Sequence, residues 1–272
     1  MKLGVVVMVL AAVSPAVADS TTDVQNAVQV TLKSFGEPSA RGMTATGKVM
    51  VDYKELEPTE GKEFGPLLLN DVEGAAKITL GAMTIVVEGS GKTAWFHAPA
   101  TLNKTALRIN GIAVNDGGWK IARIAYASVM PDKELLSHAD GAGRPSGEAP
   151  QRSGDDAIAK TVATWFDGGF AKGASKSAKL VANGTAPSEF RTGSVAALKL
   201  AQAWDKLPLR LFARSIEATA FGKMAFVRVV AVLPKANPNS EHPVIGVEIS
   251  LAAIVVNEDG VWKWQSLNWA PR

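Results

Sequence analysis

A turn sequence that occurs twice constrains the fold of this chain of 272 residues more than any other feature. Near its C-terminus the chain contains Asn257-Glu258-Asp259-Gly260-Val261-Trp262-Lys263-Trp264, and a close copy, Asn115-Asp116-Gly117-Gly118-Trp119-Lys120-Ile121, lies in mid-chain. In each copy an apolar, β-rich run stops at an Asn/Asp/Gly turn and resumes with a Trp-Lys pair. Such a pattern predicts a β-hairpin. Two copies indicate a protein built from one unit used twice.

The register of the two halves supports a duplication, because true copies keep a constant offset. Residues 91–96 match residues 222–227 at an offset of 131 residues, as between Gly91 and Gly222. The same offset pairs Phe35 with Phe166, Leu67 with Leu198, Leu69 with Leu200, Ile78 with Leu209 and Ile85 with Ile216. In the last strand the offset is 143 residues, from Trp119 to Trp262. The extra residues fall in the polar segment 234–243, a hairpin extension where insertions are tolerated.

The first residues have the pattern of a secretory signal peptide. Lys2 supplies a positive charge, residues 3–13 are apolar, and Ala16-Val17-Ala18 matches the A-x-A cleavage pattern. The apolar run is too short to span a bilayer, so we expect no stable membrane insertion after cleavage. We therefore predict a signal peptide at residues 1–18 and a protein that is exported, either periplasmic or secreted. A buried N-terminal strand is the alternative.

Composition excludes several classes of protein. The chain contains no cysteine, which excludes disulfides, thiol enzymes, cysteine-ligated zinc and acylation on cysteine. The formal net charge of +3 is small and dispersed, so we expect no nucleic-acid partner. A hydrophobic fraction of 47% is typical of a packed protein, whose stability here must come from its cores.

The order of elements in the first half predicts an α+β domain. Apolar residues keep helical spacing from Asp23 to Phe35, and the segment 39–51 is interpreted as a short helix. Residues 53–65 are interpreted as a loop, and Pro66 suits the first turn of another helix, which reaches Ala76. The apolar period then changes to two, which predicts strands at 77–88, 93–98, 105–115 and 119–129. Helices followed by antiparallel strands favour packing on one face of a curved sheet.

The second half repeats this order after a boundary. Residues 137–154 lack periodicity and are rich in Gly, Pro, Ser and Ala, so we predict a linker at 136–153, with an ordered surface loop as the alternative. Asp155 and Asp156 suit the start of a helix, and Ser194 caps another. A short amphipathic piece (172–183) and a loop (185–193) separate them, and strands are predicted at 209–219, 223–233, 244–257 and 261–269. The predicted domains are therefore 19–135 and 154–272.

Four short motifs of the second half carry a resemblance to a known family: Trp165-Phe166-Asp167, Lys179-Leu180-Val181, Phe190-Arg191-Thr192-Gly193 and Gly260-Val261-Trp262-Lys263. On these motifs the chain resembles SnoaL-like domains of the NTF2-like superfamily, over residues 154–272 and more loosely over 20–133. The resemblance implies two α+β cones, each of about three N-terminal helices packed on a curved antiparallel sheet around a pocket. Because members of this superfamily commonly pair through their sheets, it also implies that the two domains pair within the chain.

The resemblance suggests where catalytic groups would lie, and the sequence is poor in such groups. Enzymes of the superfamily place an Asp or Glu base and a Tyr, Asp or His partner inside the cone. Tyr53 lies in a predicted loop and Tyr126 on a predicted strand, so neither is on the first helix, where the resemblance would place an oxyanion donor. Of the three histidines, His138 and His242 lie in polar, loop-like segments. We assign no catalytic residue from the sequence: His97 is interpreted as an ordinary strand histidine, with a catalytic role as the alternative.

The candidates for lining a ligand pocket are Trp95, His97, Arg123, Trp165 and Arg228. His97 and Arg228 occupy equivalent positions in the two halves, so the halves do not share a catalytic histidine. The sequence predicts no cofactor, and no metal site because histidines and carboxylates do not occur at ligand spacing.

Three hypotheses for function follow. The favoured one is an exported protein of two SnoaL-like modules with no assignable catalytic activity, which binds a small apolar ligand or a protein partner. The second is an isomerase-like or cyclase-like enzyme that uses His97 and a carboxylate for acid–base chemistry in one cone. The third is a purely structural envelope protein with filled cones. The fold alone cannot choose among them, and the state of the cavity discriminates.

Overall fold

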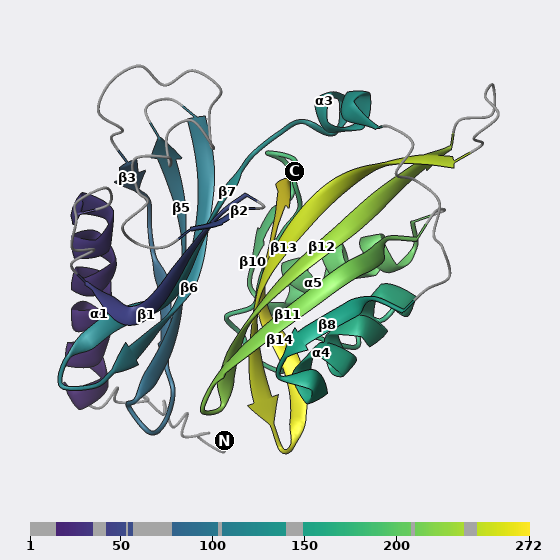
Figure 1. Ribbon diagram of the computed structural model, residues 1–272. Helices are drawn as coiled ribbons and strands as arrows, with labels where there is room; N and C mark the ends of the chain where they lie inside the picture. Colours follow the sequence, from purple (N-terminus) through teal and green to yellow (C-terminus); the bar gives the residue numbers. More distant parts are fainter. Residues whose placement is uncertain are drawn as a thin grey trace, which may run out of the picture.

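A computed structural model describes residues 15–34, 42–52, 54–56, 78–102, 105–139, 149–207, 210–236 and 244–272. Two seven-stranded sheets face each other at the centre of the molecule, and helices lie on the outer side of each (Figure 1). The chain is thus an α+β protein with two cone-like domains.

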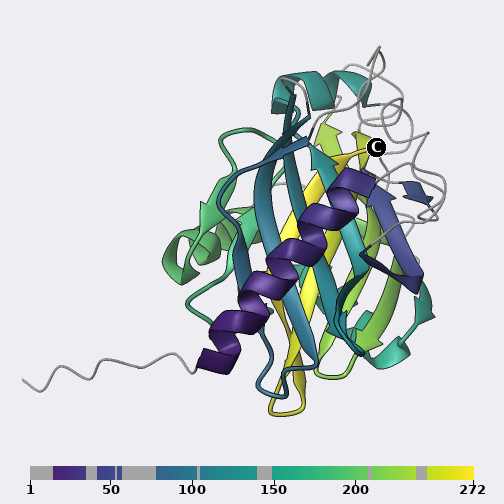
Figure 2. The same cartoon turned by 90° about the vertical axis from the view of Figure 1, so that its left-hand side faces the viewer.

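The first domain consists of one described helix and a sheet of seven strands. The helix α1 (Pro15–Ser34) crosses the outer face of the sheet diagonally, as Figure 2 shows, and buries Val24 and Val28 against it. The strands are β1 (Met43–Val51), β2 (Lys54–Leu56), β3 (Ile78–Leu80), β4 (Thr84–Val87), β5 (Thr93–Leu102), β6 (Thr105–Asn115) and β7 (Trp119–Ser128). Their order is β2-β1-β7-β6-β5-β3, with β4 also paired to β5.

The second domain has a similar strand order, with the additional edge strand β8 and more described helices. The helical segments are α3 (Asp132–Leu135), η2 (Leu136–His138), α4 (Asp156–Ala163), η4 (Thr164–Asp167) and α5 (Ser194–Asp205). The strands are β8 (Gln151–Gly154), β9 (Val181–Asn183), β10 (Phe190–Thr192), β11 (Phe212–Phe221), β12 (Met224–Ala236), β13 (Val244–Glu258) and β14 (Val261–Pro271). The sheet order is β10-β9-β14-β13-β12-β11-β8.

Local irregularities recur at equivalent positions in the two sheets. The pairing of β6 with β7 shifts between Ile112 and Ala113, and that of β13 with β14 shifts between Ile254 and Val255. Met43 pairs in parallel with Ile121, and Ala174 forms a parallel bridge to Trp264. A bulge at the same place in both sheets indicates that the two domains share one local geometry, since bulges are specific features of a fold.

The central strands of each sheet are buried on both faces. Alternate residues of a strand point to opposite faces, so Ile109 of β6 packs in the core of the first domain and Ile112 packs against the other sheet. A shared apolar cluster joins the two sheets: Met50, Trp95, Ile112, Ala125, Val181, Met224, Phe226, Ala252 and Ile254. The two domains therefore form one continuous packed body.

The contact between the sheets has the character of a two-fold interface. Asn110 Nδ2 donates a hydrogen bond to the Ala252 carbonyl over 3.0 Å, and the two residues are 142 positions apart. That separation equals the offset of the equivalent bulges in β6 and β13, so each residue meets its own counterpart. In an interface between two copies this occurs close to the two-fold axis.

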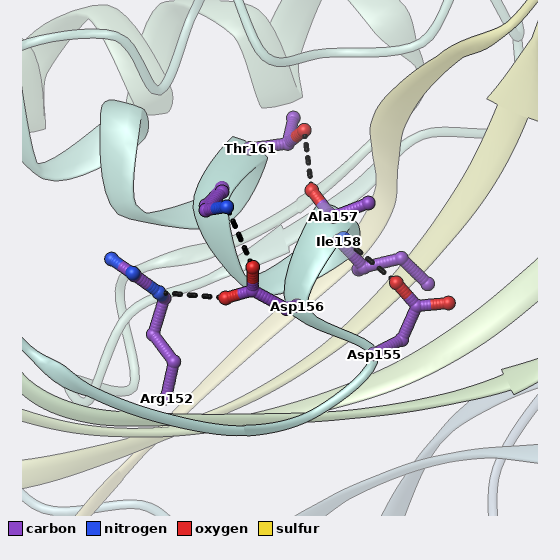
Figure 3. Close-up of polar contacts among 7 residues, drawn as sticks. Arg152, Asp155, Asp156, Ala157, Ile158 and Thr161 are labelled. Atoms are coloured by element: carbon purple, nitrogen blue, oxygen red, sulfur yellow. Dashed lines mark hydrogen bonds and ion pairs between the residues drawn. The ribbon is translucent and has the colours of Figure 1, made fainter.

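The start of α4 follows the sequence prediction (Figure 3). Asp155 is the N-cap, and its Oδ1 accepts a hydrogen bond from the Ile158 amide over 3.1 Å. Asp156 lies in the first turn and pairs with Arg152 at 3.0 Å and with Lys160 at 2.7 Å. These contacts satisfy an otherwise free amide and place negative charge at the positive end of the helix dipole.

Several predicted elements differ from the structure. Residues interpreted as a short helix form β1, because pairing with β7 outweighs the weak helical preference of a segment rich in Thr, Gly and Val. The predicted strand 77–88 is divided into β3 and β4. Both sheets are mixed, since β1 runs parallel to β7 and β9 runs parallel to β14. The predicted helix at 66–76 lies outside the described residues.

The boundary region also contains structure that the sequence did not predict. Residues 151–153, assigned to the linker, form β8 together with Gly154, and this strand pairs in parallel with β11. The sequence Gln-Arg-Ser-Gly has no apolar alternation because all four residues are exposed on an edge strand. The α1 helix begins at Pro15, inside the predicted signal peptide.

Candidate functional site

A cavity of about 530 Å³ opens at one end of the second domain. Most of its wall is apolar and comes from elements that are far apart in the chain. The lining side chains of this kind are Leu136, Trp204, Leu207, Leu211, Leu233, Pro234, Ile249 and Trp269. Its size lies within the range of small-molecule sites, and its predominantly hydrophobic wall is typical of such sites.

One side of the cavity is lined by two residues of an aromatic cluster. The ring centroid of Trp269 on β14 lies 6.1 Å from that of Trp204 on α5, at an interplanar angle of 84°. Phe166 and Phe170 pack edge-on against the indole of Trp269. Edge-to-face rings of this kind hold one another in fixed orientations. Among the residues that the structure describes, the buried Nε1 of Trp269 has no hydrogen-bond partner. The cluster therefore offers a rigid apolar surface.

The polar residues of the cavity come from three segments: Asp132 of α3, Thr185 and Glu189 of the β9–β10 loop, and Lys235 of β12. Lys235 Nζ donates to the carbonyl of Leu136 over 3.3 Å. The site thus combines an apolar wall with a few charged groups, an arrangement that can orient a ligand with one polar end.

The β9–β10 loop is closed by its own hydrogen bonds. The Gly184 amide donates to the Glu189 carbonyl over 3.0 Å, and the Glu189 amide donates to the Ala186 carbonyl over 3.0 Å. The Ala186 amide donates to Glu189 Oε2 over 3.3 Å. A Cβ at Gly184 would overlap the Glu189 side chain, so the present position of that carboxylate depends on a glycine here. The segment between the domains also contacts this loop, since the Met130 amide donates to the Thr185 carbonyl over 3.0 Å.

None of the five predicted pocket residues lines this cavity. Trp95 is fully buried in the cluster between the sheets. His97 is also buried between the sheets, where it stacks on Phe190 with centroids 5.6 Å apart. Both side chains lie on the face of the first sheet that is turned away from the core of their own domain. They are buried because the second sheet covers this face.

The other three candidates occupy separate positions. Arg123 donates to the carbonyls of Thr46 and Ala122 and lies 5.6 Å over the ring of Phe221. Arg228 forms an ion pair with Glu217 at 3.7 Å. Trp165 belongs to the core of the second domain without reaching the cavity. The structure therefore does not bring the predicted residues together in one site.

Trp204 and Trp269 were not among the residues predicted from the sequence to line a pocket. Both do pack in the core. What distinguishes them is that they also border open space, and no local pattern shows this. The one available signal was their position in the chain. Trp204 lies near the end of a helix, and Trp269 lies near the end of the last strand.

The groups with perturbed pKa values also lie outside the cavity. Burial raises the pKa of Asp52 to about 7, although hydrogen bonds from Ser128 oppose the shift. Burial and the nearby charge of Arg108 lower the pKa of His97 to about 3. Burial raises the pKa of Tyr126. Within the described part of the chain, no three His, Asp or Glu side chains form a potential metal site.

Comparisons with known proteins give the following findings. No protein-family model matches the chain, and no curated protein matches it in sequence. A putative ketosteroid isomerase from Shewanella frigidimarina is similar in structure, with 15% identity over 44% of this chain and 99% of that one, at a TM-score of 0.33. A putative dehydratase of the NTF2-like family from Streptomyces avermitilis has 11% identity over 44% and 99%, at a TM-score of 0.35.

A third similar structure is an NTF2-like protein of unknown function from Pseudomonas putida, with 11% identity over 43% of this chain and 84% of that one, at a TM-score of 0.35. Two of these three neighbours, those from Pseudomonas putida and Streptomyces avermitilis, are described as NTF2-like. Identities this low transfer no activity to the present chain. Among the helices that the structure describes, none has the length and apolar character needed to cross a membrane.

Proposed function

We propose that this chain, whose structural neighbours are NTF2-like proteins, binds a small apolar ligand in the cavity of its second domain. The observation that carries the proposal is the apolar wall of a cavity of about 530 Å³, built on the Trp204–Trp269 pair. An apolar ligand would lose its contact with water on entering the cavity, and the burial of its apolar surface drives such binding.

The proposal is for binding without catalysis. Acid–base chemistry on a carbon acid needs a base and a hydrogen-bond donor within reach of one reacting atom. His97, the candidate from the sequence, is enclosed between the sheets, where its Nε2 lies 2.9 Å from Asn183 Nδ2. Asp52 accepts hydrogen bonds from the Ser128 amide over 2.6 Å and from its hydroxyl over 3.0 Å. Neither side chain borders the cavity.

Export remains part of the same proposal and rests on the sequence of residues 1–18. Cleavage after Ala18 would remove the first residues of α1 and leave the buried Val24, Val28 and Thr31 in the mature helix. The N-terminal sequence of the protein isolated from its own source tests this proposal, and a chain that keeps residues 1–18 would contradict it.

The binding proposal is tested with a neutral apolar dye, N-phenyl-1-naphthylamine, titrated into the full chain. Dye near Trp204 and Trp269 will accept energy from their excited indoles, so binding is followed by sensitised emission. The variant Leu233→Trp places an indole in the cavity, and we expect the dye to bind about tenfold more weakly or not at all.

Val195→Trp is the matched control, because Val195 lies on α5 with 70% of its surface exposed and adds the same indole outside the cavity. Saturable binding at one site that Leu233→Trp weakens and Val195→Trp preserves supports the proposal. Absence of saturable binding, or equal binding by both variants, overturns it.

A further inference from the structure

The wall of the cavity is held in part by the first domain. Gly184, Thr185 and Glu189 line the cavity and belong to the β9–β10 loop of the second domain. Arg108, on β6 of the first domain, donates from its guanidinium to the carbonyls of Gly184 and Ala186. Both acceptors lie between β9 and β10. One side chain of the first domain thus holds the backbone of a loop that forms the wall of a site in the second.

The contact is buried and specific. Arg108 is 4% exposed, so its guanidinium has lost most of its water and depends on protein acceptors. Two carbonyls from one loop match the planar fork of a guanidinium, which a lysine ammonium cannot reproduce. Glu189 lies in the same loop and its charge favours the protonated form of Arg108, whose pKa burial lowers to about 10. The side chain is therefore charged at neutral pH.

Neighbouring contacts hold β6 against the second sheet and the two ends of the β9–β10 loop against the first domain. Asn268 Nδ2 of β14 donates to the backbone carbonyl of Arg108 over 3.1 Å, which ties β6 to the second sheet. At the ends of the loop, Asn183 contacts His97 and Phe190 stacks on the same imidazole. The first domain therefore contacts the β9–β10 loop at its beginning, middle and end.

We propose that Arg108 is a positioning residue for the ligand cavity: it fixes the β9–β10 loop and so couples ligand binding to the contact between the two domains. This inference rests on the proposed function. Coupling is reciprocal, so a ligand that needs the fixed loop also strengthens the hold of the first domain on it. The first domain, on this view, serves the binding site of the second without lining it.

The test uses Arg108→Lys in the full chain, because lysine keeps the charge and loses the fork. The first readout is amide hydrogen exchange in the absence of ligand at Gly184, Ala186 and Glu189, whose amides are hydrogen-bonded within the loop. We expect exchange at these amides to become about tenfold faster, the effect of losing one charge-assisted hydrogen bond that opposes local opening. The second readout is affinity for N-phenyl-1-naphthylamine, which we expect to fall about threefold to tenfold when the wall is no longer fixed.

Arg123→Lys is the matched control. Arg123 also lies on the first sheet and touches the second domain at Phe221, but Phe221 does not line the cavity. Unchanged exchange at the loop amides in Arg108→Lys overturns the positioning role, whether or not the dye binds. Faster exchange with unchanged dye affinity overturns the coupling.

If the wild-type chain fails to bind the dye, the proposed function fails, while the exchange experiment still decides the role of Arg108. If Arg108→Lys does not fold, Arg108→Met serves in its place, because it removes the guanidinium that holds the loop carbonyls and leaves no charge buried. Faster exchange at the loop amides in that variant supports the positioning role, and unchanged exchange overturns it.

Discussion

His97 of the first domain and Asn183 of the second meet side chain to side chain, with 2.9 Å between His97 Nε2 and Asn183 Nδ2, although they are 86 positions apart. An amide nitrogen donates, so the imidazole accepts at Nε2 and is neutral in this arrangement. His97, the one histidine that the sequence offered as an alternative candidate for catalysis, forms a buried polar link between the two sheets. A buried polar group of this kind is stable only while it keeps its partner and its charge state.

The first prediction concerns stability in acid. The folded-state pKa of His97 is lowered to about 3 from an ordinary 6.5. Its contribution to the free energy of unfolding is therefore present above pH 6.5 and is lost as the pH falls toward 3, by about 1.4 kcal/mol per pH unit. We expect His97→Gln to become steadily more stable relative to the wild type as the pH is lowered through this window. Denaturant unfolding at a series of pH values measures the difference.

His138→Gln is the control for this experiment, because His138 lies on η2 and its side chain is exposed. Comparison with the wild type at each pH removes the contributions of all other groups. An unchanged difference between His97→Gln and the wild type from pH 7 to pH 4 would contradict the assignment of a buried neutral imidazole.

The second prediction has the opposite sign. The folded-state pKa of Asp52 is raised from 3.8 to about 7 by burial. Its contribution to stability is fully present below pH 3.8 and is lost as the pH rises through 7, again by about 1.4 kcal/mol per pH unit. Asp52→Asn keeps the shape, and asparagine tolerates the positive φ of 49° at this position. We expect this variant to gain stability relative to the wild type between pH 4 and pH 8.

Asp116→Asn provides the matched control, since Asp116 lies in the exposed turn between β6 and β7. Its difference in unfolding free energy from the wild type should stay constant over the same range. A difference that is equally flat for Asp52→Asn would show that the Asp52 carboxyl ionises in the folded state as it does in water.

The third prediction concerns packing at Gly111, which pairs with Phe96 on β5 and with Ile124 on β7. A Cβ at this position would overlap the Arg123 carbonyl and the ring of Phe96. We expect Gly111→Ala to destabilise the protein by about 2 kcal/mol or more, because the central strand cannot move away from either neighbour. Thermal or denaturant unfolding measures the loss.

Gly89→Ala is the comparison, since nothing lies within 4 Å of a Cβ built there. Its effect should stay within about 0.5 kcal/mol. Equal stability of the two variants would mean that the first sheet adapts to the extra methyl group, and that the close approach at Gly111 does not limit the fold.

Much of the local structure could be predicted from the sequence. The Asn/Asp-Gly turns and the alternation of apolar residues placed β6 at 105–115 without error and the other hairpin strands within a few residues. Hairpins are local, so the residues that determine them are adjacent in the chain. The α+β class followed from the order of elements and from the NTF2-like resemblance. Segments whose pairing is distant, such as β1 and β8, were not recognised, because their partners lie far away in the sequence.

The candidate site could not be predicted in the same way. His97, Arg108, Asn110 and Asn268 have the alternation expected of a water-facing side of a sheet, yet each is at most 4% exposed because the second sheet covers them. The cavity is assembled from α3, η2, α5, the β9–β10 loop and three strands, which meet only in the folded chain.

The sequence by itself thus determined the repeated pattern, its turns and most of its strands, since these depend on neighbouring residues. The tertiary structure alone decided which face of each sheet is covered, where open space remains, and that an arginine of one domain holds the wall of the other, because each depends on contacts between distant segments.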